Sequence, residues 1–160
     1  MRLDVATAAA AAGIGVLAGM RSLAAPATVS QRLSRDGLTH RSPAPLRAFG
    51  SRRTARALKA LAVAEMGADK LPFMPDRTSP PVLAWRMLSG ALCGAALASW
   101  QRDSALLGAL IGAAAAGAAS YGLLAARKAL SRSRPLALAS GLAEDALVAG
   151  GYWAAQRALR

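Results

Sequence analysis

Residues 104–126 read SALLGALIGAAAAGAASYGLLAA, an apolar segment with no charged side chain. At a rise of about 1.5 Å per residue, a helix over this segment is long enough to cross the hydrocarbon core of a bilayer, which is about 30 Å thick. Its Gly108-x-x-x-Gly112 spacing places two glycines on one face, where a second helix can approach closely. The segment therefore predicts a transmembrane helix that packs against a neighbour.

Three other apolar segments predict spans of the same kind, at residues 3–29, 82–100 and 136–158. The span at 82–100 also contains a Gly-x-x-x-Gly pair and joins 104–126 through a short polar turn, so the two are expected to form a hairpin. A cleavable signal peptide is the alternative for the first span, but Arg21 interrupts its apolar run and Pro26 disrupts the candidate cleavage site. We expect the first span to be retained.

The composition indicates a membrane protein of one domain. The chain has 160 residues, of which 54% are hydrophobic and only 4% aromatic, so its apolar mass is mostly Ala, Leu and Gly. Such residues pack helix against helix closely but fill a soluble core poorly. We therefore predict an all-α integral membrane helical bundle over residues 1–160, with no room for a separate soluble enzyme domain.

Positive charge gathers in two connectors between the apolar segments, and the net charge is +12. The first connector, at 30–54 with Arg56 just beyond it, carries Arg32, Arg35, Arg41, Arg47, Arg52 and Arg53, and the second, at 127–135, carries Arg127, Lys128, Arg132 and Arg134. Such clusters are typical of the positive-inside rule, under which basic loops stay cytoplasmic. The connector at 30–54 has no sustained apolar period, so we expect a loop there. The two connectors contain a single aromatic residue, Phe49, and so lack an interleaved series for base stacking; the lipid bilayer and its anionic headgroups are therefore expected partners and nucleic acid is not.

A short helix is predicted at 55–70, and it ends at Leu71-Pro72 because the residue before a proline avoids helical angles. If both basic connectors are cytoplasmic, the spans 82–100 and 104–126 supply the two crossings between them. The helix at 55–70 would then be re-entrant or partly inserted, in a bundle of four crossings with both termini outside. If it does cross, one basic connector lies on the opposite side, which the rule tolerates in a minority of proteins.

Arginine and acidic residues alternate twice along the chain, an order compatible with a degenerate internal repeat. The order is Arg21, then Glu65 and Asp69, then Arg86, then Glu144 and Asp145. Inverted repeats with broken helices are common in transporters, where the substrate site lies near the bilayer midplane. The Gly-x-x-x-Gly faces also allow a homo-oligomer.

Glu65 and Asp69 are four residues apart, so on a helix their carboxylates lie on one face, with Lys70 next to them. An ionised group near a bilayer centre costs at least about 2.5–3.5 kcal/mol, so it normally meets a partner or a watery cavity. Arg21, Arg86 or Lys70 can neutralise the pair. Three interpretations stay open: a structural ion network, a transport site for protons, cations or a small charged solute, or exposure at the membrane interface.

Arg21 and Ser22 interrupt the first predicted span. Arg21 either snorkels to the cytoplasmic headgroups or forms, with Ser22, a polar break whose freed backbone groups line a cavity. Arg86 starts a span and is either interfacial or part of the same polar site. Glu144 and Asp145 lie near the middle of the last span and point about 100° apart, so at most one of them faces a common site. Pairing of that acid with Arg21 or Arg86 is expected.

Several short motifs occur in order over nearly the whole chain: Gly19-Met20-Arg21-Ser22, Ala68-Asp69-Lys70-Leu71-Pro72, Arg86-x-x-Ser89-Gly90 and Ala143-Glu144-Asp145-Ala146. Together they resemble an uncharacterised family of small bacterial integral-membrane proteins that carry a domain of unknown function. The Ala-Asp-Lys-Leu-Pro block is the most specific of them. The resemblance implies a multi-helix protein of the bacterial inner membrane, and it supplies no activity.

The sequence offers little for catalysis or metal binding. His40 is the only histidine and lies in a polar connector, and Cys93 is the only cysteine, so neither a histidine triad nor a zinc site has a second partner. A phosphate-binding loop of the Gly-x-x-x-x-Gly-Lys-Ser/Thr type does not occur. We expect no enzyme activity and no cofactor or metal.

The sequence thus predicts a channel or transporter for an ion or small charged solute. The residues expected to form its polar pathway are Arg21, Ser22, Glu65, Asp69, Lys70, Arg86, Glu144 and Asp145. A non-transporting membrane scaffold or assembly factor, in which the same charges hold the helices together, is the alternative. A membrane enzyme comes third and needs an acid pair that water can reach.

Overall fold

The computed structural model describes residues 2–36, 38, 42–68 and 79–130, and this part of the chain is helical throughout, without strands. Its helices are α1 (Val5–Met20), α2 (Ala24–Asp36), α3 (Ala44–Phe49), α4 (Arg52–Ala68), α5 (Pro80–Trp100) and α6 (Ala105–Leu130). The expected all-α class is confirmed. The predicted span at 136–158 lies outside the described residues.

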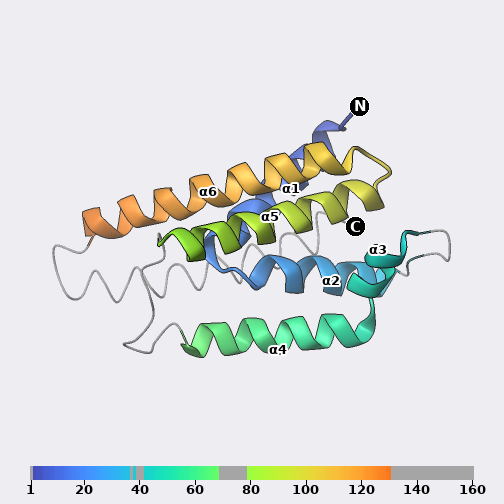
Figure 1. The fold of residues 1–160 in the computed structure, drawn as a ribbon, viewed down its shortest axis with the longest axis horizontal. Helices are drawn as coiled ribbons and strands as arrows, with labels where there is room; N and C mark the ends of the chain where they lie inside the picture. The colour runs from blue at the N-terminus through green and yellow to red at the C-terminus, as the bar shows by residue number, and fades with distance from the viewer. Residues whose placement is uncertain (1, 37, 39–41, 69–78, 131–160) are drawn as a thin grey trace.

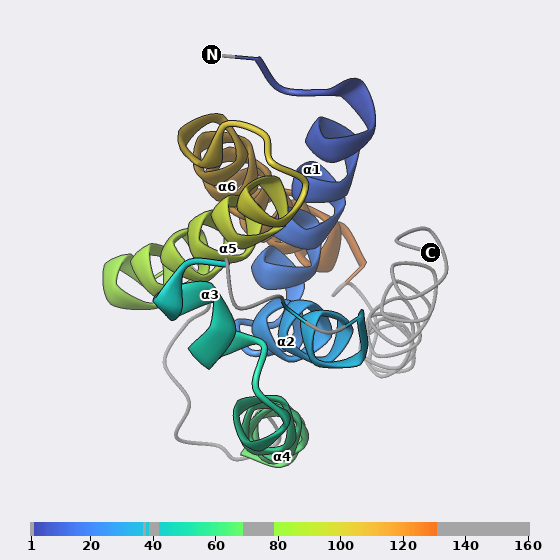
Figure 2. The same ribbon diagram turned by 90° about the vertical axis from the view of Figure 1, so that its right-hand side faces the viewer.

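Three helices, α1, α5 and α6, pack together, α2 lies against this group, and α4 lies on the outer side of α2 (Figure 1, Figure 2). α5 and α6 are antiparallel and joined by a tight turn, in which the Asp103 amide donates to the Ala98 carbonyl at 2.8 Å. α1 runs beside α6 in the same direction, whereas α2 turns back toward the end of the molecule where α1 begins (Figure 1). The first two helices therefore form a bent pair against the α5–α6 hairpin.

Close backbone contacts at glycines hold α1, α5 and α6 together. A Cβ atom on Gly94 would overlap the carbonyl group of Gly108, and a Cβ atom on Gly112 would overlap the carbonyl group of Gly90. The same face of α6 also receives α1, because a Cβ atom on Gly15 would overlap the Gly112 carbonyl oxygen. The Gly-x-x-x-Gly faces of α5 and α6 thus pack on each other within one chain, in the hairpin that their spacing predicts.

The single span predicted at 3–29 is two helices in the structure. The chain leaves helical angles at Arg21, which is extended with φ −146° and ψ 123°, and resumes a helix at Ala24. Apolar composition alone favoured one continuous helix here. The expectation is wrong because side chains from other helices bind the backbone groups that the interruption frees, as described below.

The loop predicted at 30–54 is also largely helical, since α2 continues to Asp36 and is followed by α3 and the start of α4. Two buried leucines, Leu33 and Leu46, give these short helices apolar contacts that the sequence period did not reveal. The Ser30 hydroxyl donates to the Phe49 carbonyl oxygen at 2.5 Å and so ties the end of α3 to α2. Tertiary packing therefore overrides a weak local pattern.

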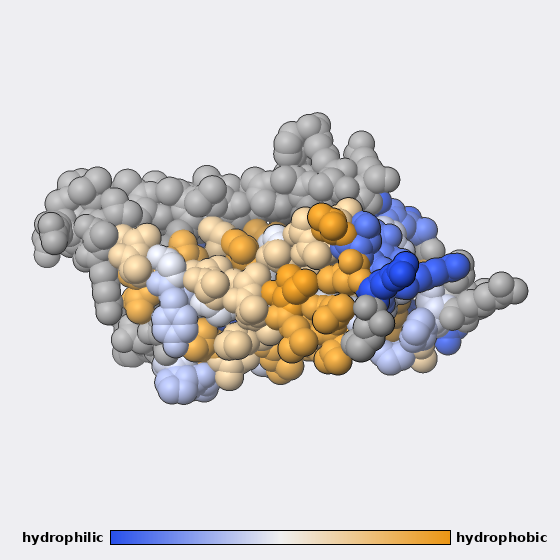
Figure 3. Space-filling model, turned by 90° about the horizontal axis from the view of Figure 1, so that it is seen from above, coloured by the Kyte–Doolittle hydropathy of each residue, from blue (hydrophilic) through white to orange (hydrophobic). Residues whose placement is uncertain are grey.

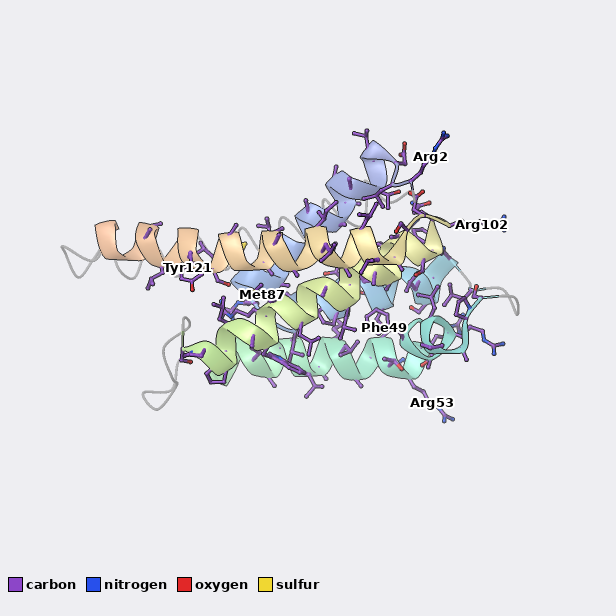
Figure 4. All side chains as sticks on the ribbon, turned by 45° about the horizontal axis from the view of Figure 1, so that its top comes forward. Arg2, Phe49, Arg53, Met87, Arg102 and Tyr121 are labelled. Carbon is purple, nitrogen blue, oxygen red and sulfur yellow. The ribbon has the colours of Figure 1, made fainter. Side chains whose placement is uncertain are left out.

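Several segments meet at one end of the bundle, which we call the basic end: the residues before α1, the end of α2, α3, the start of α4 and the α5–α6 turn (Figure 1). Figure 4 shows Arg2 and Arg102 at this end of the molecule. The Ser104 amide donates to the Arg2 carbonyl oxygen at 3.3 Å. The Arg32 guanidinium lies 5.9 Å from the ring centre of Trp100, which places the end of α2 beside the end of α5.

This arrangement differs from the one expected from charge alone. That argument placed the connector at 30–54 and the α5–α6 turn on opposite sides, whereas both lie at the basic end (Figure 1). The physical reason is that α2 turns back, and that α4 then runs along α2 to the opposite end of the bundle. The end of α6, where the second basic connector begins, lies at that opposite end (Figure 1).

Among the described residues, two helices are long and apolar enough to cross a membrane, α5 and the Ala105–Ala126 part of α6. α1 is apolar but shorter, with 16 residues. Large apolar side chains on α5 and α6 point outward, and Leu92, Leu106 and Leu110 are 58–60% exposed. Figure 3 shows hydrophobic side chains over the middle of one face and hydrophilic ones gathered toward one end. Exposed apolar surface of this kind is typical of contact with lipid or another apolar partner.

Replacing Gly112 by alanine is expected to destabilise the protein by about 1–3 kcal/mol, because the added Cβ would push α6 away from Gly90 and Gly15. Gly122 on the same helix is the matched control, since nothing lies within 4 Å of a Cβ atom there. Gly122→Ala should leave stability unchanged or raise it slightly. Thermal unfolding of both variants, followed by circular dichroism in detergent, tests this. Equal midpoints for the two variants would contradict the packing described.

Candidate functional site

The chain leaves the helical path between α1 and α2 at Arg21, Ser22 and Leu23, which we call the α1–α2 break. The Arg21 amide still donates to the Leu17 carbonyl at 2.9 Å, and the Ala27 amide already donates to the Leu23 carbonyl at 3.0 Å. The interruption is therefore short. Arg21 and Ser22 are each only 6% exposed, so the last carbonyl groups of α1 and the first amides of α2 lie inside the bundle.

Glu65, from α4, binds the α2 side of the break. Its two carboxylate oxygens accept hydrogen bonds from the Ser22 amide at 3.0 Å and from the Leu23 amide at 2.9 Å. Amides at the start of a helix have no partner in the preceding chain, and the helix dipole makes this end favourable for a negative group. Glu65 therefore supplies both an acceptor and a complementary charge to α2.

Arg86 and Ser89, from α5, bind the α1 side of the break and its centre. The Arg86 Nη1 group donates to the Gly19 carbonyl oxygen at 2.5 Å, and the Ser89 hydroxyl donates to the Ser22 carbonyl oxygen at 2.5 Å. Both side chains are buried, and their three-residue spacing places them on one face of α5. A cation at the last turn of α1 is favourable because the dipole is negative there.

Ser120, from α6, completes the set of side chains around the break. Its hydroxyl oxygen lies 2.8 Å from the Ala116 carbonyl oxygen of its own helix and 3.3 Å from the Gly19 carbonyl oxygen. A hydroxyl has one proton to donate, so the shorter contact within α6 is the main one. Three different helices, α4, α5 and α6, thus contribute polar side chains to one interruption of the chain.

The structure brings together four of the residues predicted to form a polar pathway: Arg21, Ser22, Glu65 and Arg86. The burial of Arg21 and Arg86 fits the polar-break interpretation and not snorkelling or an interfacial position. The other four predicted residues lie outside the described part of the chain; they are Asp69, Lys70, Glu144 and Asp145.

Sequence reasoning missed Ser89 and Ser120 as members of this site. Both are small hydroxyl residues within long apolar segments, where a serine is easily tolerated. A signal was present for each. Ser89 lies three residues after Arg86, and Ser120 lies four residues after Ala116 and eight after Gly112, both of which face neighbouring helices. The face of a span that carries close-packing glycines is therefore also the face on which to look for polar side chains.

The arrangement can hold charge at two helix ends that lie next to each other. Glu65 reaches the break from the periphery, because α4 packs on the outer side of α2 (Figure 2). Withdrawal of Glu65 would leave the two inward-facing amides of the break, those of Ser22 and Leu23 just before α2, open to another negative group, while Arg86 stays bound to α1. In the described residues no group of three His, Cys, Asp or Glu side chains is placed to hold a metal ion.

Replacing Arg86 by methionine is expected to destabilise the protein by about 1.5–3 kcal/mol, because the Gly19 carbonyl would lose a charged donor in a buried position. Arg53→Met is the control, since Arg53 is exposed on α4 and such substitutions change stability by less than about 0.5 kcal/mol. Denaturant or thermal unfolding of the two variants in the same detergent gives the comparison. The role of Arg86 would be refuted if its variant were as stable as the control.

No protein-family model matches this chain, and neither a curated protein nor a solved structure matches it. The resemblance to small bacterial membrane proteins of unknown function therefore stays a prediction. What the protein does has to be inferred from the α1–α2 break and from the surfaces around it.

Proposed function

We propose that the protein is a multi-pass protein of the bacterial inner membrane that moves an ion or a small charged solute through the α1–α2 break. In this proposal α5, α6 and residues 136–158 cross the bilayer, and α4 crosses it as well, because α4 runs from the basic end to the opposite end, where α5 begins (Figure 1). The fourth expected crossing, at 3–29, is replaced by the bent pair of α1 and α2, which enters from the basic end and returns to it. The basic end faces the cytoplasm under the positive-inside rule, and the connector at 127–135 is the exception.

The observation that carries this proposal is a helix interrupted inside the bundle, with both freed ends bound by side chains of other helices. At membrane depth, irregular backbone is tolerated only where protein or a water-filled cavity surrounds it. Transporters commonly use such discontinuous helices, whose N-terminal ends face negative groups of the substrate and whose C-terminal ends bind cations. The α1–α2 break has one end of each kind.

Glu65 is the group that would change partner during a transport cycle. Its carboxylate occupies the amide end of α2, which is where a negative solute group would bind. α4 contacts the rest of the described bundle mainly through α2, so it can move without separating α1, α5 and α6. In this mechanism α4 moves Glu65 away from the Ser22 and Leu23 amides, and a negative group of the solute binds there in its place. The helices α1, α5 and α6, which pack through glycines, do not move.

Glu65→Gln is expected to reduce flux in proteoliposomes at least tenfold while the protein stays folded, because an amide has one acceptor oxygen for two amides and carries no charge. Asp36→Asn is the control, since Asp36 pairs with Arg32 at 2.8 Å on the surface, away from the break. Proton, potassium, chloride and acetate fluxes are the probes. The proposal fails if none exceeds the rate of empty vesicles, or if Glu65→Gln transports as well as Asp36→Asn.

A membrane scaffold or assembly factor is the second candidate, and one observation favours it. Glu65, Ser89 and Arg86 each reach a backbone group of the break at 2.5–3.0 Å, as in a fixed joint between helices. A scaffold needs these contacts for stability alone, so Glu65→Gln would lower the unfolding midpoint without changing any flux. Deletion within residues 37–51 would then remove a protein that co-purifies with the full chain.

The proposed membrane arrangement also predicts which parts of the chain lie on the same side. Cysteines in place of Arg2, Arg47 and Arg102, in a Cys93→Ala background, are expected to react with a membrane-impermeant maleimide from one side only, because all three lie at the basic end. Ala126→Cys, near the other end of α6, should react only from the opposite side. Labelling of Arg2→Cys and Arg47→Cys from opposite sides would show that α1 and α2 together cross the membrane after all.

A further inference from the structure

α4 has an exposed face that changes character halfway along the helix. Its first two turns expose four basic side chains, which are Arg52, Arg53, Arg56 and Lys59. The following turns expose apolar side chains instead, and Leu61 and Val63 are 51% and 61% exposed. The opposite face of α4 packs on α2. The exposed face of α4 is therefore basic in the first half of the helix and apolar in the second half.

The basic half of α4 has no acidic residue near it in the sequence. No Asp or Glu occurs between Asp36 and Glu65 in the sequence. Asp36 itself is bound to Arg32 within α2. Figure 4 shows Arg53 directed outward at the end of the molecule where Arg2 and Arg102 lie. Asp4 and Asp103 also lie at this end, but basic side chains outnumber acidic ones there, so the field around the exposed half of α4 is positive.

The two halves of α4 match the layers of a bilayer. α4 runs alongside α2 and along the length of the bundle, so its start is level with the α5–α6 turn, and its later turns are level with the middle of α5, on the outer side of α2 (Figure 1, Figure 2). From Arg52 to Lys59 the helix rises about 10 Å, close to the headgroup layer, which is about 5–8 Å thick on each side. Leu61 and Val63 then lie at the depth of the acyl chains.

We propose that the exposed basic half of α4 binds the headgroups of anionic phospholipids in the leaflet at the basic end. Guanidinium groups form paired hydrogen bonds with phosphate oxygens, and lysine adds a point charge. The apolar half of α4 supplies contacts for the acyl chains of the same lipids. This site goes beyond the transport activity proposed above and rests only on the membrane insertion that forms part of that proposal.

Lipid bound in this way holds α4 in position beside α2. α4 also carries Glu65. Binding of anionic headgroups to α4 therefore favours the state in which the Glu65 carboxylate accepts hydrogen bonds from the Ser22 and Leu23 amides. The lipid site and the α1–α2 break are thus linked by a single rigid helix. The link predicts that the composition of the membrane affects the break without any lipid reaching it.

Native mass spectrometry of the purified protein with equimolar phosphatidylglycerol and phosphatidylcholine tests the site. We expect the unsubstituted protein to retain phosphatidylglycerol preferentially. The double variant Arg53→Gln, Arg56→Gln should lower that preference at least fivefold, since each basic side chain near a charged surface contributes about that factor. The matched control, Arg2→Gln, Arg102→Gln, removes two exposed charges from the same end but away from α4, and should lower the preference less than twofold.

Four outcomes would overturn the proposal, three of them in the binding experiments and one in a test of membrane insertion. The first is equal retention of the two lipids by the unsubstituted protein, and the second is an equal loss in the two double variants, which would indicate general charge and not a site on α4. The third concerns the protein in phosphatidylcholine nanodiscs. It is that the unsubstituted protein binds duplex DNA and the Arg53→Gln, Arg56→Gln variant does not, while both proteins show the same preference for phosphatidylglycerol. Release of the protein from cell membranes by alkaline carbonate would defeat membrane insertion itself, and the lipid site with it. If the proteoliposomes show no flux, the transport proposal fails, but the preference for phosphatidylglycerol is still expected.

Discussion

Glu65 makes the contact on which the placement of α1, α2 and α4 depends. A helix that starts inside a protein presents amides that the preceding chain cannot bind, and each buried amide left without an acceptor costs about 1–3 kcal/mol. The Glu65 carboxylate binds the amides of Ser22 and Leu23 together. The chain can therefore reverse after α1, α2 can return to the basic end, and α4 is fixed along α2 at the level of the break.

The polar contacts around the break and the close packing of α1 on α6 share a residue, Gly19. A Cβ atom there would overlap the Ala116 carbonyl group, so the absence of a side chain lets α1 and α6 touch. The carbonyl oxygen of the same residue accepts from Arg86 and lies near the Ser120 hydroxyl. Close approach and charge compensation thus support each other, because Arg86 and Ser120 reach a carbonyl that bulkier neighbours would hold at a distance.

Long, uninterrupted apolar segments were enough to predict α5, α6 and their glycine contacts, since length and small-residue spacing are properties of the chain itself. Charges in apolar segments must meet partners, which is why Arg21, Glu65 and Arg86 were expected to gather. The reversal at Arg21 was not predictable, because local composition favours a continuous helix and the group that stabilises the break is 43 residues away. Burial of Leu33, which helps to form α2, likewise depends on helices distant in sequence.

The α1–α2 break has a consequence for the order in which the protein is assembled. Its partners are made after it, since Glu65 follows Ser22 by 43 residues, and Arg86 and Ser120 follow Gly19 by 67 and 101 residues. When the ribosome has delivered α1 and α2, none of these side chains exists yet. The hydrogen bonds that these side chains make to the break can therefore form only after α4, α5 and α6 have been synthesised. The α1–α2 break precedes in synthesis all of the side chains described above as binding it.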